Sequence, residues 1–334
     1  MRQVTERAIR WGIVGCGDVV EVKSGPGFQH ADGSSLVAVT RRDRAKAEDF
    51  ARRHGVPCVH ATAQDLIADP DVDAVYIATP PSSHRDLALA AAAAGKPCLV
   101  EKPMAMTHAE CVDMVTAFAR RGVPLWAAYY RRALPRFLKV RDLLRSGAIG
   151  RVTSVQIEVL DLLPATDQPI GWRVDPATSG GGLFFDVGSH CLDMVDFLIG
   201  PIRQIAGFAE NTGGAYAAED VTAASFLCGN QILGSGLWNF NSDRRRDTFT
   251  IRGTAGAIAT AMFSDADVVL ACDTGSEVFP FRNPPHVHQP LIQTIVDELL
   301  GRGRCESAGE SGARTSWALE QCVADYYRGN TARR

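Results

Sequence analysis

The segment Glu101-Lys102-Pro103 places a lysine directly after a carboxylate, and lysine is scarce in this chain. Of the 35 lysines and arginines, five are lysines, at positions 23, 46, 96, 102 and 139. An ammonium group is compact and can lose its proton when it is buried, whereas a guanidinium stays charged. Lys102 is therefore a candidate for stabilising or protonating a reacting oxygen. The alternative is a lysine with a purely structural role.

The segment 180–193 carries a histidine and two carboxylates at helical spacing, and it reads GGGLFFDVGSHCLD. In a helix from Leu183 to Ile199, Asp186, His190 and Asp193 lie one turn apart on a single face. A neighbouring carboxylate orients an imidazole and stabilises its protonated form, as a general acid or base requires. The alternative is a surface Asp-His pair on a capped helix. The three glycines are expected to let the backbone pass close to a ligand.

A glycine turn, Gly15-Cys16-Gly17, directly follows the apolar run from Trp11 to Val14. Backbone without side chains lets a dinucleotide pyrophosphate approach the amides at a helix N-terminus. Val20 occupies the third glycine position of the G-x-G-x-x-G pattern, so the pattern is incomplete. We predict a dinucleotide site here; the alternative is a simple tight turn.

A second apolar run, Leu36 to Thr40, ends in Thr40-Arg41-Arg42. At this position an NAD enzyme usually offers an acid to the ribose 2′-hydroxyl. Two guanidiniums beside a hydroxyl suit a 2′-phosphate instead, which favours NADP, with NAD as the other possibility. The alternative is two solvated arginines at the start of a charged helix.

The elements that position these residues divide into two types. Residues 11–130 alternate short buried strands with helices, which predicts a doubly wound parallel sheet, and Asp43 is expected to cap a helix. Later segments, such as Val155-Gln156-Ile157-Glu158-Val159, alternate with period two, which predicts a largely antiparallel open sheet in an α+β domain. Gly229-Asn230 is expected to form a two-residue hairpin turn. The predicted domains are 1–127 and 128–334, with two last helices, 290–300 and 312–327, that can pack back on the first domain.

Composition excludes several classes of protein. The net charge of −3 gives no broad basic surface for nucleic acid or anionic membrane. The longest apolar run, Leu87 to Ala94, is too short to span a bilayer, and the N-terminal residues lack a signal-type core, which predicts a cytoplasmic protein. The nine cysteines include no C-x-x-C pair and no zinc-finger spacing. They are expected to be structural thiols, with no metal site.

Taken together, the glycine turn, Glu101-Lys102-Pro103, Trp172-Arg173 and the segment 180–193 resemble the Gfo/Idh/MocA oxidoreductases over nearly the whole chain. The resemblance implies an N-terminal Rossmann domain and a C-terminal sheet that builds homodimers or homotetramers. It implies NAD(P)-dependent hydride transfer to or from a sugar, polyol or related carbonyl compound.

The resemblance also implies roles for individual residues. Lys102, Asp186 and His190 correspond to the catalytic trio, and the roles of Lys102 and His190 can be interchanged. The resemblance, together with the glycine turn and the arginine pair, also predicts a set of cofactor-binding residues: Gly15, Gly17, Asp18, Val19, Thr40, Arg41, Arg42, Thr79, Pro80, Pro81, His84, Glu101, Lys102, Arg131, Trp172 and Arg173. Tyr130 is a candidate neighbour of this set.

Two other functions stay open at this point. One is an enzyme of the same fold acting on a non-sugar substrate, such as an aromatic dihydrodiol or a tetrapyrrole. The other is a regulatory protein that binds dinucleotide without catalysis, although such a protein is expected to lack Lys102 or His190. His286 and His288, in a proline-rich segment, are expected to be structural or surface residues; the alternative is that they reach the site.

Overall fold

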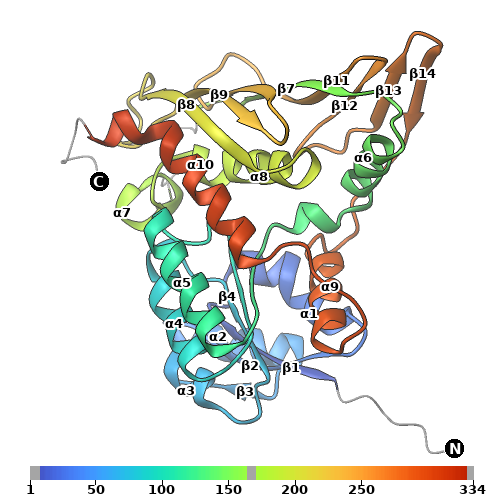
Figure 1. Ribbon diagram of the computed structural model, residues 1–334. Helices are drawn as coiled ribbons and strands as arrows, with labels where there is room; N and C mark the ends of the chain where they lie inside the picture. The colour runs from blue at the N-terminus through green and yellow to red at the C-terminus, as the bar shows by residue number, and fades with distance from the viewer. Residues whose placement is uncertain (1–7, 164–170, 329–334) are drawn as a thin grey trace, which may run out of the picture. The chain divides into compact units, whose positions relative to one another are not determined.

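The computed structural model describes residues 8–163 and 171–328, which form two compact units (Figure 1). The first unit comprises residues up to 105, 109–134 and 284–312. The second comprises 106–108, 135–283 and the residues from 313 onward. The domain boundary expected between residues 127 and 128 stays a prediction.

The first unit contains a six-stranded parallel sheet, as predicted. Its branched and apolar strand residues are buried on both faces, and all four residues of the central strand β4 are buried. The strand order is that of a Rossmann fold: β3 (Cys58–Val59), β2 (Ser34–Thr40), β1 (Ile9–Val14), β4 (Ala74–Ile77), β5 (Cys98–Val100) and β6 (Leu125–Ala127).

Helices follow these strands in the chain: α1 (Gly25–His30), α2 (Arg44–His54), α3 (Ala63–Ala68), α4 (His84–Ala93) and α5 (His108–Arg121). A further helix, α9 (Gln289–Leu299), comes after the strands of the second unit in the chain. The predicted cap of α2 is confirmed, because the Asp43 side chain accepts a hydrogen bond from the Lys46 amide. Helix α9, one of the two predicted late helices, belongs to this unit and packs on α1.

The first helical segment departs from a regular Rossmann helix at Val20. Residues Val20–Ser24 form a π-helical turn, η1, before α1 begins. Val20 is fully buried, and a Cβ at Gly25 would lie 2.5 Å from the Val20 carbonyl oxygen. The branched Val20 side chain therefore fills the space that a glycine at this position would leave open. One turn later, Gly25 has no Cβ that would collide with the Val20 carbonyl oxygen.

The second unit contains an eight-stranded sheet in which every neighbouring pair is antiparallel except β7 with β10. Its order is β14 (Gly275–Phe279), β13 (Val268–Cys272), β12 (Gly256–Thr260), β11 (Arg246–Gly253), β7 (Val152–Leu160), β10 (Ile232–Asn239), β9 (Val221–Cys228) and β8 (Ile202–Glu210). The largely antiparallel sheet was predicted correctly. The two-residue hairpin was not, because Cys228 pairs with Ile232 and leaves a three-residue loop. Gln231 closes that loop with φ 64°.

Helices cover the inner face of this second sheet. Helix α8 (Leu183–Leu198) packs on β9, and its Phe184 ring lies 4.9 Å from the Trp238 ring of β10. Helix α10 (Gly309–Arg328) approaches β8 so closely that a Cβ at Gly207 would lie 2.9 Å from the Cys322 carbonyl oxygen. Helix α6 (Pro135–Arg145) contacts α8 and β13. Within the described ranges, no helix is both long enough and apolar enough to cross a membrane.

Candidate active site

The predicted groups of the first unit meet at the carboxyl-end edge of the parallel sheet. The Gly15 amide donates to the Thr40 carbonyl at 2.9 Å, which joins the glycine turn to the end of β2. The Ala78 amide donates to Val14 at 2.8 Å, and the Glu101 amide donates to Ile77 at 2.9 Å. The backbone ladder therefore aligns the residues that follow β1, β2, β4 and β5 along one edge, where ligands of such sheets bind.

The two glycines of the turn have different roles. Gly15 has φ +95°, and a Cβ there would lie 2.8 Å from the Thr79 side chain, so the fold itself requires glycine. At Gly17 a Cβ would have no heavy atom within 4 Å. The backbone at Gly17, with Asp18 and Val19 after it, is thus open to an approaching group. This space fits a pyrophosphate.

Arg41 lies against the glycine turn, since its Nη1 donates to the Cys16 carbonyl at 3.0 Å. The guanidinium is therefore held beside the segment where a pyrophosphate would bind. Thr40 is 4% exposed, and Arg42 is exposed to solvent.

The loop after β4 is tied to the Glu101-Lys102-Pro103 segment through His84. The His84 Nε2 lies 2.7 Å from the Thr79 carbonyl oxygen, and Nδ1 lies 3.1 Å from that of Pro103. The side chain is fully buried, and burial lowers its pKa. His84 therefore joins the Thr79 loop to the segment that carries Lys102, and its place in the cofactor-binding set stays a prediction.

Glu101 is held by a buried network. The Tyr76 hydroxyl donates to Glu101 Oε1 at 2.5 Å, and the Lys102 amide donates to Oε2 at 3.1 Å. The Lys102-Pro103 peptide bond is cis. The two hydrogen bonds to Glu101 fix the backbone from which the Lys102 side chain extends.

His288 lies in the same cluster, although the sequence predicted a structural or surface residue. It is 2% exposed, its Nδ1 lies 3.6 Å from Glu101 Oε1, and its ring stacks on Tyr130 at 4.4 Å. Burial, and then the charges of Lys23, Lys102 and Arg131, lower its pKa to about 3. His288 is therefore neutral at physiological pH. No local pattern links it to Glu101, because the two residues are far apart in the chain.

In the second unit, Trp172, Arg173 and Asp186 lie together. Arg173 Nε is 3.5 Å from Asp186 Oδ2, and the guanidinium lies 4.8 Å from the centre of the Trp172 ring. Trp172 and Arg173 belong to the short helix η4 (Trp172–Val174), and Asp186 lies in the first turn of α8. Asp186 is half-buried.

The other predicted members of the α8 face are more deeply buried. His190 is 4% exposed, and its ring lies 6.1 Å from that of Phe263. Asp193 is 1% exposed, and the Thr315 hydroxyl of α10 donates to it at 3.5 Å. Asp193 therefore joins two helices, while Asp186 faces the more open end of α8.

The glycines before α8 serve packing, and the expectation that they admit a ligand is wrong. A Cβ at Gly181 would lie 2.2 Å from the Phe185 ring, and one at Gly182 would lie 2.3 Å from the Glu219 carbonyl oxygen. Gly180 adopts φ +90° and ends the short helix α7 (Pro176–Ser179). The protein's own atoms fill the space.

Sequence reasoning missed Glu219, which holds the start of α8. This fully buried carboxylate accepts a 2.8 Å hydrogen bond from the Gly182 amide and a 2.5 Å hydrogen bond from the Tyr327 hydroxyl. Burial raises its pKa from 4.5 to about 7. Nothing in the local sequence marks it, because its partners come from distant segments.

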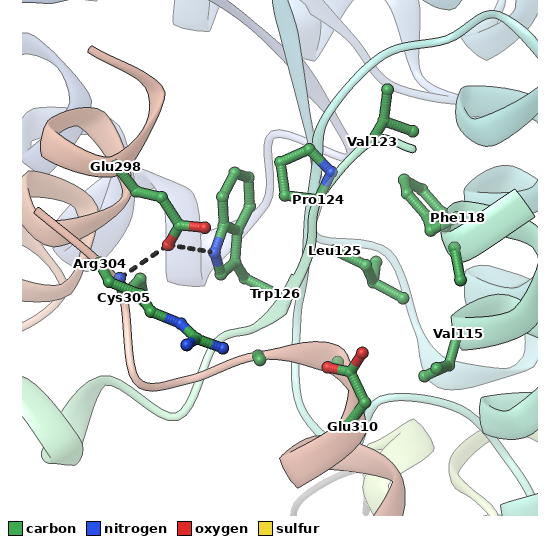
Figure 2. Close-up of a pocket in the computed structure, with 13 residues that line it drawn as sticks. Val115, Phe118, Val123, Pro124, Leu125, Trp126, Glu298, Arg304, Cys305 and Glu310 are labelled. Carbon is green, nitrogen blue, oxygen red and sulfur yellow. Dashed lines mark hydrogen bonds between the residues drawn. The ribbon is translucent and has the colours of Figure 1, made fainter. Parts of the chain in front are cut away.

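A separate pocket of about 180 Å³ lies in the first unit, beside β6 (Figure 2). Glu298 accepts hydrogen bonds there from the Trp126 indole and the Cys305 amide. None of the predicted site residues lines this pocket.

Comparison with known families identifies both halves of the chain. Residues 9–129 match the family described as "Oxidoreductase family, NAD-binding Rossmann fold". Residues 137–259 match the "GFO/IDH/MocA C-terminal domain".

Three relatives illustrate the range of related enzymes. The chain is 37% identical to "Oxidoreductase P35" of Formosa agariphila, over 94% of this chain and 98% of the relative. It is 26% identical to a 1,5-anhydro-D-fructose reductase of Ensifer adhaerens, over 94% of each. It is 30% identical to a trans-1,2-dihydrobenzene-1,2-diol dehydrogenase of Macaca fascicularis, over 75% of this chain and 73% of the relative. The chain therefore belongs to the Gfo/Idh/MocA family and is an NAD(P)-binding oxidoreductase.

Proposed function

We propose that this oxidoreductase prefers NADP and transfers a hydride between nicotinamide C4 and a carbinol or carbonyl carbon of a sugar, polyol or keto-sugar. The observation that carries the proposal is the alignment of the glycine turn, Arg41, Thr79 and Glu101-Lys102 along one edge of the parallel sheet. The similarity to an anhydrofructose reductase supports the sugar class.

The residues of the first unit suit the cofactor. The open backbone from Gly17 to Val19 would receive the pyrophosphate, and Arg41, with Thr40 and Arg42, would bind a 2′-phosphate. Thr79, Pro80, Pro81, Glu101 and Arg131 would border the nicotinamide end, and Trp172 and Arg173 complete the proposed set. Bound NADP would supply or accept the hydride.

Three side chains carry the proposed acid-base chemistry. Lys102 donates a hydrogen bond to the reacting substrate oxygen and stabilises the negative charge that develops there. His190 exchanges a proton with that oxygen, and Asp186 orients the substrate hydroxyl or His190. An exchange of the Lys102 and His190 roles is the alternative. His288 and Tyr76 are proposed to position Glu101, and through it the Lys102 backbone.

The decisive variant is Lys102→Met, which keeps an unbranched side chain one atom shorter and removes its charge. We expect kcat to fall by about 100-fold or more, the range of acid-base and oxyanion contributions, while NADPH still binds. Lys46→Met is the control, because Lys46 is exposed on α2. NADPH oxidation is followed spectrophotometrically and cofactor binding by calorimetry. An unchanged kcat would refute the role of Lys102.

A second substrate class rests on a specific observation, the similarity to dihydrodiol dehydrogenases. The substrate screen therefore includes sugars, inositols, keto-sugars and aromatic trans-dihydrodiols, each with NADP and NAD. Activity on the dihydrodiols alone would replace the sugar proposal. Tight cofactor binding without activity on any substrate would favour a regulatory protein.

The proposal also includes a cytoplasmic location and assembly into a homodimer or homotetramer through the second sheet. Buried thiols fit a reducing compartment: desolvation raises the pKa of Cys305 to about 11 and that of Cys322 to about 12. Cell fractionation tests the location.

A further inference from the structure

Three candidate metal ligands lie together at the edge of the first sheet, next to the end of β2. Cys58 Sγ is 3.4 Å from His60 Nε2, and His60 Nε2 is 2.8 Å from Asp69 Oδ2. All three atoms lie within 4.8 Å of one another. We propose that Cys58, His60 and Asp69 bind a zinc ion, a departure from the expectation of structural thiols alone.

The local fold explains why these residues meet. Cys58 lies in β3, the edge strand, and residues two apart in an extended chain point to the same side. The His60 amide donates to the Val39 carbonyl at 3.0 Å, so the chain stays paired with β2 at this point. Asp69 is the C-cap residue of α3, and its carboxylate lies beside His60. A metal ion here would join the short edge strand to the end of the following helix.

The donor set suits Zn²⁺, which binds thiolate, imidazole and carboxylate in tetrahedral geometry. Bond lengths of roughly 2.0 to 2.3 Å place the ligand atoms about 3.4 to 3.6 Å apart. The Cys58–His60 separation of 3.4 Å already matches. The His60–Asp69 separation of 2.8 Å is that of a hydrogen bond, and it must lengthen by about 0.6 Å when the metal replaces the proton.

Neighbouring groups orient the Asp69 carboxylate and set the charge around the proposed ion. Asp69 Oδ1 accepts a 2.7 Å hydrogen bond from the Asp71 amide, which leaves Oδ2 for the metal. The Lys96 ammonium donates to the Asp69 carbonyl at 2.5 Å, and its charge opposes a dication. When Zn²⁺ replaces the thiol proton, which leaves to solvent, one thiolate and one carboxylate neutralise the ion.

The side chains of His60 and Asp69 are 18% and 17% exposed, so an ion can reach them from solvent. The three ligands leave a fourth position for water. Three protein ligands and an open fourth position differ from the closed four-ligand arrangement of a structural zinc site, and the binding tests are independent of the proposed oxidoreductase activity.

Cobalt titration of the full, metal-stripped chain tests the proposal, because a thiolate-bound Co²⁺ gives a charge-transfer absorption band. We expect the band to saturate at one Co²⁺ per chain and to be reversed by Zn²⁺. Cys58→Ser should abolish it, whereas Cys272→Ser, at the other half-buried thiol outside the site, should leave it unchanged. His60→Gln and Asp69→Asn should each weaken Zn²⁺ affinity at least about tenfold.

A second measurement keeps the proposal testable if a variant does not fold. In the wild-type chain, Zn²⁺ should slow alkylation of Cys58 by iodoacetamide, located by peptide mass, whereas Mg²⁺ should not. An unchanged alkylation rate, or a cobalt band that persists in Cys58→Ser, would overturn the proposal. The cluster would then be a His60–Asp69 hydrogen bond with a neighbouring thiol.

Discussion

At the scale of single residues, Arg41 and Arg42 are neighbours of the same type that differ in burial and hydrogen bonding. Arg41 is half-buried and donates to the carbonyl of Cys16, inside the glycine turn, whereas Arg42 is exposed. A guanidinium already fixed near the pyrophosphate position loses little rotational freedom when it binds a 2′-phosphate. We therefore assign the larger part of the proposed NADP preference to Arg41.

Arg41→Ala tests that assignment. Charge-assisted hydrogen bonds contribute roughly 1.5 to 3 kcal/mol, so the KM for NADPH should rise about 10- to 100-fold, more than the KM for NADH, which lacks the 2′-phosphate. The measurement is a comparison of initial rates at varied concentrations of each cofactor. Arg44→Ala, which removes a surface guanidinium paired with Glu48, is the control. Equal effects on both cofactors would favour the solvated-arginine alternative.

Residue positions could be predicted where they depend on local pattern. The Asp43 cap precedes its helix directly, and Asp186 and His190 stand one helical turn apart. The contacts of Glu219 with Gly182 and of His288 with Glu101 join distant segments. These pairs exist only after the chain has folded, so no spacing in the sequence could predict them.

At the scale of elements, the start of α8 depends on an internal carboxylate. Gly182 is the N-cap of this helix, and its side chain, a single hydrogen, cannot cap. Glu219 lies at this end of the helix and accepts the Gly182 amide proton, while the Tyr327 hydroxyl holds the other carboxylate oxygen. The position of Asp186, one turn into α8, therefore depends on a residue of the loop before β9.

Glu219 should also make stability depend on pH. Its pKa of about 7 in the folded chain lies above the ordinary 4.5, so the folded state binds more protons between these values. The free energy of unfolding should therefore fall, by roughly 3 kcal/mol from this group, as pH rises from 4.5 to about 7. Below this pH range, the full stabilisation from Glu219 is present.

Glu219→Gln tests this prediction, because the amide oxygen can still accept from Gly182 but does not titrate. Urea unfolding at several pH values should show that the difference in unfolding free energy, wild type minus variant, decreases through this range. Glu48→Gln, at an exposed carboxylate of α2, should retain the wild-type dependence. A pH-independent difference for Glu219→Gln would contradict a raised pKa.

The elements themselves followed sequence pattern closely, except where a local signal was incomplete. Alternation of Val155, Ile157 and Val159 predicted β7, because one buried face imposes a period of two. Edge strand β3 is two residues long and carries no periodicity to detect. The hairpin after β9 was predicted one residue too short, because Gln231 adopts a left-handed conformation that its residue type does not suggest.

At the scale of the whole molecule, the face of the second sheet that carries Phe208 bears on the proposed assembly. Phe208 of β8 is 80% exposed and Leu233 of β10 is 61% exposed. The register aligns Phe208 with Ala223 of β9 and Leu237 of β10. Small and apolar residues therefore share this face, whereas β7 presents Gln156 and Glu158 on the same side. Phe208 and Leu233 lie two rows apart on this face, with Ser225 and Ser235 in the row between them. Exposed apolar residues grouped on one face mark interaction sites.

Phe208→Glu should convert the proposed homo-oligomer into monomers without unfolding it, because burying an unpaired charge in an apolar interface is strongly unfavourable. Light scattering coupled to size exclusion measures the mass, and circular dichroism reports the fold. Val112→Glu, at a 44% exposed valine of α5 in the first unit, should leave the mass unchanged. A wild-type chain that is monomeric at all concentrations, or a Phe208→Glu oligomer of unchanged mass, would show that this face does not mediate assembly. If Phe208→Glu is monomeric, its kinetics would separate assembly from catalysis, since the proposed catalytic residues Lys102, Asp186 and His190 all lie within one chain.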